Sequence, residues 1–215
     1  MKPFQHAFIE LAIRLGVLKF GEFTLKSGRK SPYFFNSGNF KSGKSLHAVG
    51  TAFAEAIQDY QITTSGLFGP AYKGIPLATA TATAMYSQFG IDLPVTSSRK
   101  EMKMHGEGGM LIGAPLNGNI LIIDDVITAG TAKREAIEVI KSHGAHVAGV
   151  LIAVDRQEKG LNTLSAVQEL EQKMNIPVKS IINLNNIIDY LKSNPNSNYA
   201  TFLTKIEDYR QEYGV

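Results

Sequence analysis

The segment Ile120–Ala132 reads ILIIDDVITAGTA, and it carries most of the information about the fold. Its four leading apolar residues are typical of a buried strand, two acids follow, and a short run of Thr, Ala and Gly opens a helix. Small residues let a ligand approach the backbone closely, and the first amides of a helix have no partner inside it. Such amides, together with the helix dipole, bind phosphate well. The pattern therefore predicts a phosphate site between a strand and a helix.

The acid pair within this segment, Asp124 and Asp125, would repel a bare phosphate. It is explained if the ligand also carries hydroxyls, because the two carboxylates can accept hydrogen bonds from a ribose while the amides hold its 5′-phosphate. The hydroxyls of Thr128 and Thr131 can add donors. A helix-capping Asp with a solvated neighbour is the plainer interpretation of two adjacent acids. The thirteen residues taken together favour a sugar phosphate.

Strands and helices alternate on both sides of this segment. Strands are expected at residues 66–69, 95–98, 120–124, 147–154 and 178–183, and helices at 46–60, 74–89, 132–140, 164–174 and 202–209. This alternation is typical of an α/β fold, in which a parallel sheet is covered by helices on both faces. Ligands bind such sheets at the carboxyl ends of the strands, so we expect the chemistry just after each strand.

The first 41 residues follow a different rhythm. Apolar residues at helical spacing indicate a helix over residues 4–15, and Gly16 is a plausible end for it. Two β-prone runs follow, Glu22–Lys26 and Pro32–Asn36, with a turn between them. We therefore expect a small N-terminal hood of residues 1–41 beside an α/β core of residues 42–215.

Composition limits the classes of function. The chain has 215 residues, of which 44% are hydrophobic and 19% charged, which is a globular profile. It has no cysteine, and this excludes disulfides, a thiolate nucleophile and Cys-based metal sites. A net charge of +3 fits an anionic ligand but does not indicate nucleic acid. The longest apolar run, Val147–Val154, is far shorter than the ~18 residues that a membrane span needs. With no signal-peptide pattern at the start, we expect a cytoplasmic protein.

Several common sites are missing from the sequence. It contains no GxxxxGK[ST] motif and no GxGxxG motif after the first core strand, which argues against a Walker-type nucleotide hydrolase and a dinucleotide dehydrogenase. The histidines have no metal-ligand spacing, so we expect no metal held by the protein alone.

Two other segments carry groups that suit an anion. Gly69–Gly74 lies between a strand and a helix, and its amides with the Lys73 ammonium suit pyrophosphate, although a turn with a solvated lysine is the plainer alternative. Arg99–Gly109 places three basic residues and a histidine before three glycines, which suits a lid that excludes water. An exposed mixed-charge loop is its plainer alternative. With an ordinary pKa near ~10.4, Lys103 would act there as an electrostatic clamp.

Two more segments suit an anionic ring. Lys26–Asn36 places cations beside aromatic residues, so its aromatic faces or its backbone around Phe34 and Phe35 could hold such a ring. The plainer alternative is a basic turn before a half-buried strand. Arg156 follows the strand that ends near Val154, and its guanidinium could grip a carboxylate through two hydrogen bonds. Its plainer alternative is a surface ion pair with Asp155.

Taken together, these segments resemble a known family. Ile120–Ala132 resembles the signature of phosphoribosyltransferases, which use 5-phosphoribosyl-1-pyrophosphate (PRPP). With Lys26–Asn36, Gly69–Gly74, Arg99–Gly109 and Asp155–Glu158, the chain resembles the bacterial orotate phosphoribosyltransferase family over essentially its whole length. The resemblance implies a type I phosphoribosyltransferase-like parallel sheet flanked by helices. It also implies conversion of orotate and PRPP to orotidine 5′-monophosphate and pyrophosphate.

The resemblance also implies roles for individual residues. Catalysis would depend on Arg99, Lys103, His105, Asp124 and Asp125. PRPP would be bound by Lys26, Tyr72, Lys73, Arg99, Lys100, Lys103, His105, Asp124, Asp125, Val126, Ile127, Thr128, Ala129, Gly130, Thr131 and Ala132. Orotate would be bound by Phe34, Phe35, Thr128 and Arg156.

The resemblance further implies a cofactor, a partner and one backbone feature. Members of the family need Mg²⁺, which is held mainly through PRPP, and they act as homodimers whose lid reaches into the partner's site. We also expect a cis peptide bond near Ala71–Tyr72. Whether Lys103 would act in its own subunit or in the partner stays open at this point.

Two other functions remain to be separated from this one. A phosphoribosyltransferase for a purine base would share the phosphate site but should lack an arginine directed at a carboxylate. A PRPP-sensing regulator of RNA or DNA would need a basic stripe outside the lid, and the net charge gives little sign of one.

Overall fold

The computed structural model describes residues 1–25, 27–103, 109–127, 131–160 and 163–215, with residues 100–103 and 109 described as backbone only. A six-stranded sheet has the order β5-β4-β3-β6-β7-β8, and all neighbouring strands are parallel except the pair β4–β5. The strands are β3 (Gly66–Gly69), β4 (Val95–Lys103), β5 (Gly109–Gly113), β6 (Asn119–Asp124), β7 (His146–Asp155) and β8 (Val178–Asn183). The predicted α/β class is therefore confirmed.

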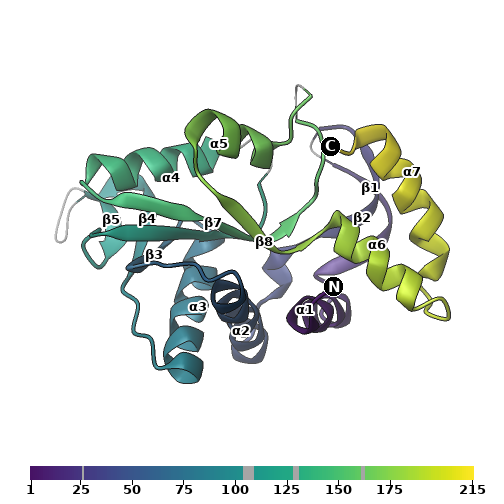
Figure 1. Ribbon diagram of the computed structural model, residues 1–215, viewed down its shortest axis with the longest axis horizontal. Coiled ribbons are helices and arrows are strands. Elements are labelled where there is room, and N and C mark those ends of the chain that lie inside the picture. The colour runs from purple at the N-terminus through teal and green to yellow at the C-terminus, as the bar shows by residue number, and fades with distance from the viewer. Residues whose placement is uncertain (26, 104–108, 128–130, 161–162) are drawn as a thin grey trace.

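Helices cover both faces of the sheet (Figure 1). α2 (Gly43–Asp59) and α3 (Gly74–Phe89) lie on one face, and α4 (Thr131–Ser142) and α5 (Ala166–Met174) lie on the other. In β6, Leu121 and Ile123 join the first hydrophobic cluster, while Ile120 and Ile122 join the second. Because neighbouring side chains of a strand point to opposite faces, a strand buried on both sides must be apolar throughout.

Both ends of the chain build the hood. α1 (Pro3–Arg14) precedes an antiparallel hairpin of β1 (Leu18–Thr24) and β2 (Lys30–Phe35), and a short 3-10 helix, η1 (Ser37–Asn39), follows. α6 (Leu184–Ser193) packs on α1, and α7 (Leu203–Tyr213), preceded by the 3-10 turn η2 (Ala200–Phe202), packs on β2. The hood thus contains the C-terminal helices as well as residues 1–41, and its status as a separate domain stays a prediction.

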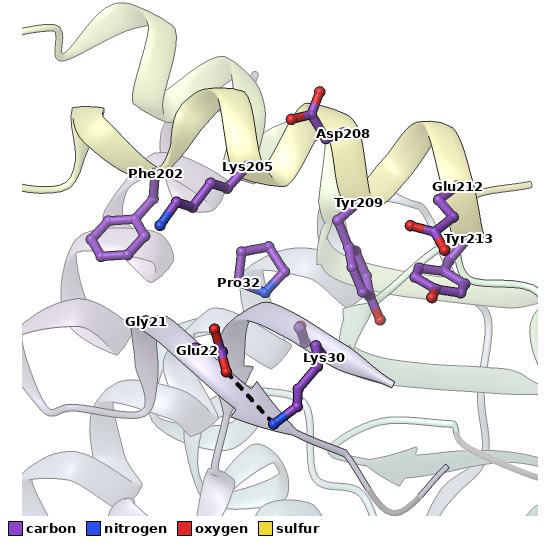
Figure 2. A pocket seen from close by; sticks show the side chains of 11 residues that line it. Gly21, Glu22, Lys30, Pro32, Phe202, Lys205, Asp208, Tyr209, Glu212 and Tyr213 are labelled. Carbon is purple, nitrogen blue, oxygen red and sulfur yellow. Dashed lines mark ion pairs between the residues drawn. The ribbon is translucent and has the colours of Figure 1, made fainter. Parts of the chain in front are cut away.

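A cavity of about 370 Å³ lies between the hairpin and α7 (Figure 2). Charged and aromatic side chains line this cavity. Glu22 and Lys30, paired at 3.6 Å, lie on the hairpin side, and the helix side carries Lys205, Asp208 and Tyr209. No helix in the described part of the chain is long and apolar enough to cross a membrane.

The structure differs from the sequence-based expectations in four elements, one of which is β5, a strand that was not expected. β1 begins at Leu18, four residues earlier than expected, because a register shift between Phe20 and Phe23 obscures its alternation. α6 was not expected at all. The interpretation of residues 99–109 as a loop throughout is wrong for Arg99–Lys103, which continue β4 and in which Lys103 pairs with Gly109 of β5 after a register shift. Residues 104–108, the rest of the predicted lid before β5, lie outside the described residues.

Candidate functional site

The carboxyl ends of β3, β6 and β7 meet at one edge of the sheet. Phe68 of β3 is in register with Ile122 of β6, and Asp124 of β6 is in register with Ile152 of β7. The hood closes this edge, because η1 and β2 both contact it through side chains. The segments that sequence analysis singled out after these three strands therefore lie next to one another.

Asp125 is the carboxylate at which these elements converge. Only 7% exposed, it accepts hydrogen bonds at Oδ2 from Ser37 Oγ (2.6 Å) and Lys73 Nζ (3.1 Å). The Val126 amide donates to its Oδ1 at 2.8 Å. Burial alone would raise the pKa of Asp125, but the Ser37 hydrogen bond and the Lys73 ammonium outweigh it and lower that pKa below its ordinary value. Asp125 is thus held as a carboxylate.

Asp124 lies one residue earlier and faces the other side of the strand end. It is 6% exposed; its Oδ1 accepts from the Asp125 amide at 2.9 Å, and its Oδ2 pairs with the Lys133 ammonium. Burial raises the pKa of Asp124 above its ordinary value, although Lys133 pulls it down. Sequence analysis placed both aspartates correctly at the strand end but missed Lys133.

The loop between β3 and α3 forms the second side of the site. Its Ala71–Tyr72 peptide bond is cis, which confirms the expectation at this position. The Ala71 amide donates to Ser98 Oγ at 3.1 Å, so β4 anchors the loop. The Tyr72 side chain is 65% exposed, and the half-exposed Lys73 reaches Asp125. A lysine that is solvated on one side and paired with an acid on the other can turn toward an incoming anion.

The start of this loop requires glycine. A Cβ on Gly69 would lie 2.5 Å from the carbonyl oxygen of Gly74, where α3 begins. Real Cβ atoms do not approach backbone this closely. The short loop can therefore join β3 to α3 along this path only with glycine at this position.

Arg156 is the buried cation at the end of β7. Its side chain is 13% exposed, and it donates to Glu158 Oε1 from Nε (2.9 Å) and Nη2 (2.6 Å) and to Ser31 Oγ from Nη2 (3.1 Å). The guanidinium lies over the Tyr33 ring, 4.2 Å from its centre. Burial alone would lower the pKa of Arg156, but Tyr33, once ionised, and Glu158 raise it, so the charge is permanent.

This arrangement replaces the surface pair considered from sequence. The partner of Arg156 is Glu158, whereas Asp155 Oδ1 accepts from the Gln157 amide at 2.9 Å. Ser31 lines the cavity beside α7 and also accepts a hydrogen bond from Arg156, so the cavity and the guanidinium share this residue as a neighbour.

The two expected aromatic contacts are placed differently. Phe35 is 8% exposed and lies in the core near Phe8, with ring centres 6.5 Å apart. Phe34 is half-buried and stacks on Phe23 with centres 5.5 Å apart. A ring ligand could therefore meet the face of Phe34 or the strand backbone, while the Phe35 side chain is used in packing.

The remaining expected site residues are only partly described. Val126 and Ile127 are half-buried before the gap, and Thr131 and Ala132 are exposed at the start of α4. The Nε of Arg99 is buried and has no hydrogen-bond partner within the ranges that the structure covers. The expectations for Lys26, His105, Thr128, Ala129 and Gly130, and for the side chains of Lys100 and Lys103, lie outside the described residues.

Sequence analysis missed three side chains that contact the site: Ser37, Lys133 and Glu158. Glu158 stood in a quoted segment, but its partner depends on how the chain turns after β7. Lys133 offered a signal, because a cation in the first turn of a helix runs against the helix dipole. Ser37 carried none, since its contact with Asp125 joins residues 88 positions apart.

The site was also considered as a metal centre. Within the covered ranges, no group of three or more His, Cys, Asp or Glu residues could hold a metal ion. Mg²⁺ commonly binds through one or two carboxylates plus the phosphates of a substrate. Two aspartates beside two loops that suit anions fit an ion that arrives with its ligand.

Known proteins are similar to this chain in sequence and in fold. Residues 38–180 match the family model for the phosphoribosyl transferase domain. The chain is 54% identical, over the full length of both proteins, to orotate phosphoribosyltransferases of Photorhabdus laumondii and Escherichia coli K12. A crystal structure of orotate phosphoribosyltransferase from Francisella tularensis superposes with a TM-score of 0.87 at 43% identity, covering 97% of this chain and 100% of that one.

Proposed function

Because the chain belongs to the orotate phosphoribosyltransferase family, we propose that it transfers the 5-phosphoribosyl group of PRPP to orotate. The products are orotidine 5′-monophosphate and pyrophosphate, and the reaction is a step of de novo UMP biosynthesis. One observation supports the assignment of the site most directly. The Asp124–Asp125 pair, the Lys73 loop and the buried Arg156 follow adjacent strands at one edge of the sheet.

Each part of PRPP meets a matching group in this proposal. The amides at the start of α4, including those of Thr131 and Ala132, hold the 5′-phosphate. The carboxylates of Asp124 and Asp125 accept from the ribose hydroxyls. The β3–α3 loop and the Lys73 ammonium hold the pyrophosphate, and this requires Lys73 to turn away from Asp125.

Orotate occupies the space between the hood and β7. Its carboxylate takes the remaining hydrogen-bonding edge of the Arg156 guanidinium, and its ring lies along β2 near Phe34. Glu158 and Tyr33 hold the guanidinium before the ligand arrives. The conformational entropy that the arginine side chain loses on binding is therefore smaller than for a solvated arginine.

The reaction needs positioning and electrostatics rather than an enzyme nucleophile. As the bond from the anomeric carbon to pyrophosphate breaks, positive charge develops on the ribose, and a ring nitrogen of orotate attacks the opposite face. The carboxylates below the ribose stabilise this charge, while the Lys73 loop and the predicted lid residues Arg99, Lys100 and Lys103 stabilise the leaving pyrophosphate.

Mg²⁺, held mainly through the oxygens of PRPP, would neutralise part of the pyrophosphate charge. The carboxylates of Asp124 and Asp125, at the ribose end of the proposed site, would assist in holding the ion. We infer no protein cage for the ion.

We further infer a homodimer with shared active sites in the cytoplasm. Tyr86, Phe89 and Ile91 are large apolar residues that remain exposed near the end of α3, as expected of a surface that a second subunit covers. Mixing a Lys103→Ala subunit with an Asp125→Asn subunit tests shared sites. Activity that reappears on mixing supports them, and its absence in a proven mixed dimer contradicts them.

A purine phosphoribosyltransferase is the nearest alternative. A purine base has no carboxylate, so the buried, pre-oriented Arg156 would have no role in binding it. A PRPP-sensing regulator is less well supported, because the residues near the site that the structure describes pair acids with bases and present no basic stripe.

The proposal is tested by mixing the protein with Mg²⁺, PRPP and orotate and following the loss of orotate's ultraviolet absorbance. We expect turnover with orotate and none with hypoxanthine. Turnover with hypoxanthine but not orotate would favour the purine alternative, and salt-dependent nucleic-acid binding without turnover would favour the regulator.

A further inference from the structure

Lys133 is a buried lysine in an unfavourable position. It is the third residue of α4 and is 6% exposed. Lysine is almost never fully buried without a partner, and a cation at a helix N-terminus opposes the helix dipole. On the same helix, Lys141 is exposed in the last turn, where the dipole favours it. Neither helix formation nor solvation explains Lys133, so its reason lies in what it contacts.

Within the described ranges, the Lys133 ammonium contacts two groups, both at or just after the end of β6. It pairs with Asp124 Oδ2, and it donates to the Val126 carbonyl oxygen at 2.7 Å. These groups lie on either side of Asp125 in the sequence. Lys133 therefore ties the strand end and the second residue after the strand to the helix.

The contacts of the two aspartates divide cleanly. Asp125 Oδ2 is bonded by Ser37 and Lys73 from the hood and the β3–α3 loop, whereas Asp124 Oδ2 is bonded by Lys133 from α4. Each acid thus has one ammonium group of its own. Because Lys73 turns from Asp125 to the pyrophosphate in the proposed complex, Lys133 is the ammonium that stays with the acid pair there.

We propose that Lys133 is a positioning residue for the transfer reaction. It orients the Asp124 carboxylate toward the ribose hydroxyls, cancels its charge against the phosphate groups of PRPP, and fixes the backbone at Val126 where the phosphate loop begins. The inference rests on the proposed function, because it assigns Lys133 to the PRPP half of that site.

Among the side chains that the structure describes, few charged groups face Asp124. Lys133 approaches from α4 and Asp125 lies beside it on the strand end, while Lys73 from the β3–α3 loop is bonded to Asp125. Removing Lys133 takes away the cation that opposes the effect of burial, so the pKa of Asp124 rises further. Asp124 then becomes protonated at a higher pH, and PRPP use fails earlier as the pH falls.

The test compares Lys133→Met, Lys133→Arg and the matched control Lys141→Met, which makes the same chemical change at an exposed position of α4. For Lys133→Met we expect kcat/KM for PRPP to fall about tenfold or more, while the KM for orotate changes by less than about twofold. The acid limb of the pH profile of kcat/KM for PRPP should move to higher pH. Lys133→Arg should recover most of the loss, and Lys141→Met should match the unmodified protein.

A merely structural role would give a different result. It would lower the melting temperature of Lys133→Met but leave kcat/KM for PRPP and the acid limb unchanged in the folded protein, and this would overturn the proposal.

If Lys133→Met does not fold, Asp124→Asn is compared with Asp124→Asn/Lys133→Met, in which no unpaired charge is buried. Values of kcat/KM for PRPP that agree within about threefold support the proposal, because only the hydrogen bond to Val126 is left to lose, and a further loss of about tenfold or more contradicts it.

Turnover by the unmodified protein is measured first, because its absence would contradict the proposed function and not the role of Lys133. In that case calorimetry with PRPP and Mg²⁺ decides. Weaker binding of PRPP to Lys133→Met than to Lys141→Met supports the inference, and equal binding overturns it.

Discussion

Replacing Arg156 by lysine separates the two substrates of the proposed reaction. The arginine is already held by Glu158 through Nε and Nη2, by Ser31 through Nη2, and by the face of the Tyr33 ring. The orotate carboxylate must therefore accept from Nη1, the nitrogen of the guanidinium that these contacts do not use. A lysine keeps the charge that Glu158 needs, so the hood should still fold, but a single ammonium cannot hold Glu158 and Ser31 and also donate to the ligand carboxylate as the remaining Nη1 group of the arginine can.

The size of the effect follows from this geometry. Losing one charge-assisted hydrogen bond to the ligand costs about 2 kcal/mol. That free energy corresponds to a factor of about 30 in affinity. We therefore expect Arg156→Lys to raise the KM for orotate about 30-fold. The KM for PRPP should change by less than about threefold, because the PRPP groups contact other strands.

Initial rates measured from orotate absorbance at varied orotate and varied PRPP give both constants. Arg134→Lys is a suitable control, because Arg134 bonds Glu169 at 2.7 Å on the exposed surface of α4. It should leave both constants unchanged. Equal losses for orotate and PRPP in Arg156→Lys, with the control intact, would refute the carboxylate assignment.

Three further predictions test other parts of the site. Lys103→Ala should lower kcat by about 100-fold or more if the lid stabilises the leaving group, and unchanged turnover would remove Lys103 from the mechanism. Ser37→Ala removes a donor that lowers the pKa of Asp125, and the ionised Asp125 contributes stability that is present at neutral pH and lost as the pH falls. In the variant this contribution should be lost at a higher pH. Urea unfolding at several pH values measures the free energy of unfolding, and a pH dependence equal to that of the unmodified protein contradicts the prediction. Gly69→Ala places a Cβ 2.5 Å from a backbone carbonyl and should destabilise the protein by about 1–3 kcal/mol, whereas Gly43→Ala, with open space around it, should not; equal melting temperatures would contradict this.

Much of the core could be predicted from sequence because its signals are local. The apolar run of β6 is buried on both faces, and the acid pair lies at the carboxyl end of this strand, as the sequence predicted. The predicted strands at 66–69 and 178–183 coincide with β3 and β8. Alternation of strands and helices was sufficient to predict a parallel sheet, although not its antiparallel edge strand β5, and it indicates the edge at which we expect ligands.

The parts that sequence analysis missed depend on distant partners or on weak local patterns. α6 follows β8 without a linker, so its Asn183 cap and its apolar spacing were hidden by the end of the strand. β5 is short, and it is a strand only because it pairs with β4. Likewise, Lys133 has a meaning only once α4 is placed beside the end of β6.

The central claim is that the aspartate pair and the start of α4 hold the two ends of one phosphorylated ribose. A crystal structure of the protein with PRPP and Mg²⁺ tests it most directly. The account predicts the ribose hydroxyls within hydrogen-bond distance of the carboxylates of Asp124 or Asp125, with the 5′-phosphate on the amides that open α4. A ribose bound at any other part of the sheet edge, or in the cavity beneath α7, would contradict it.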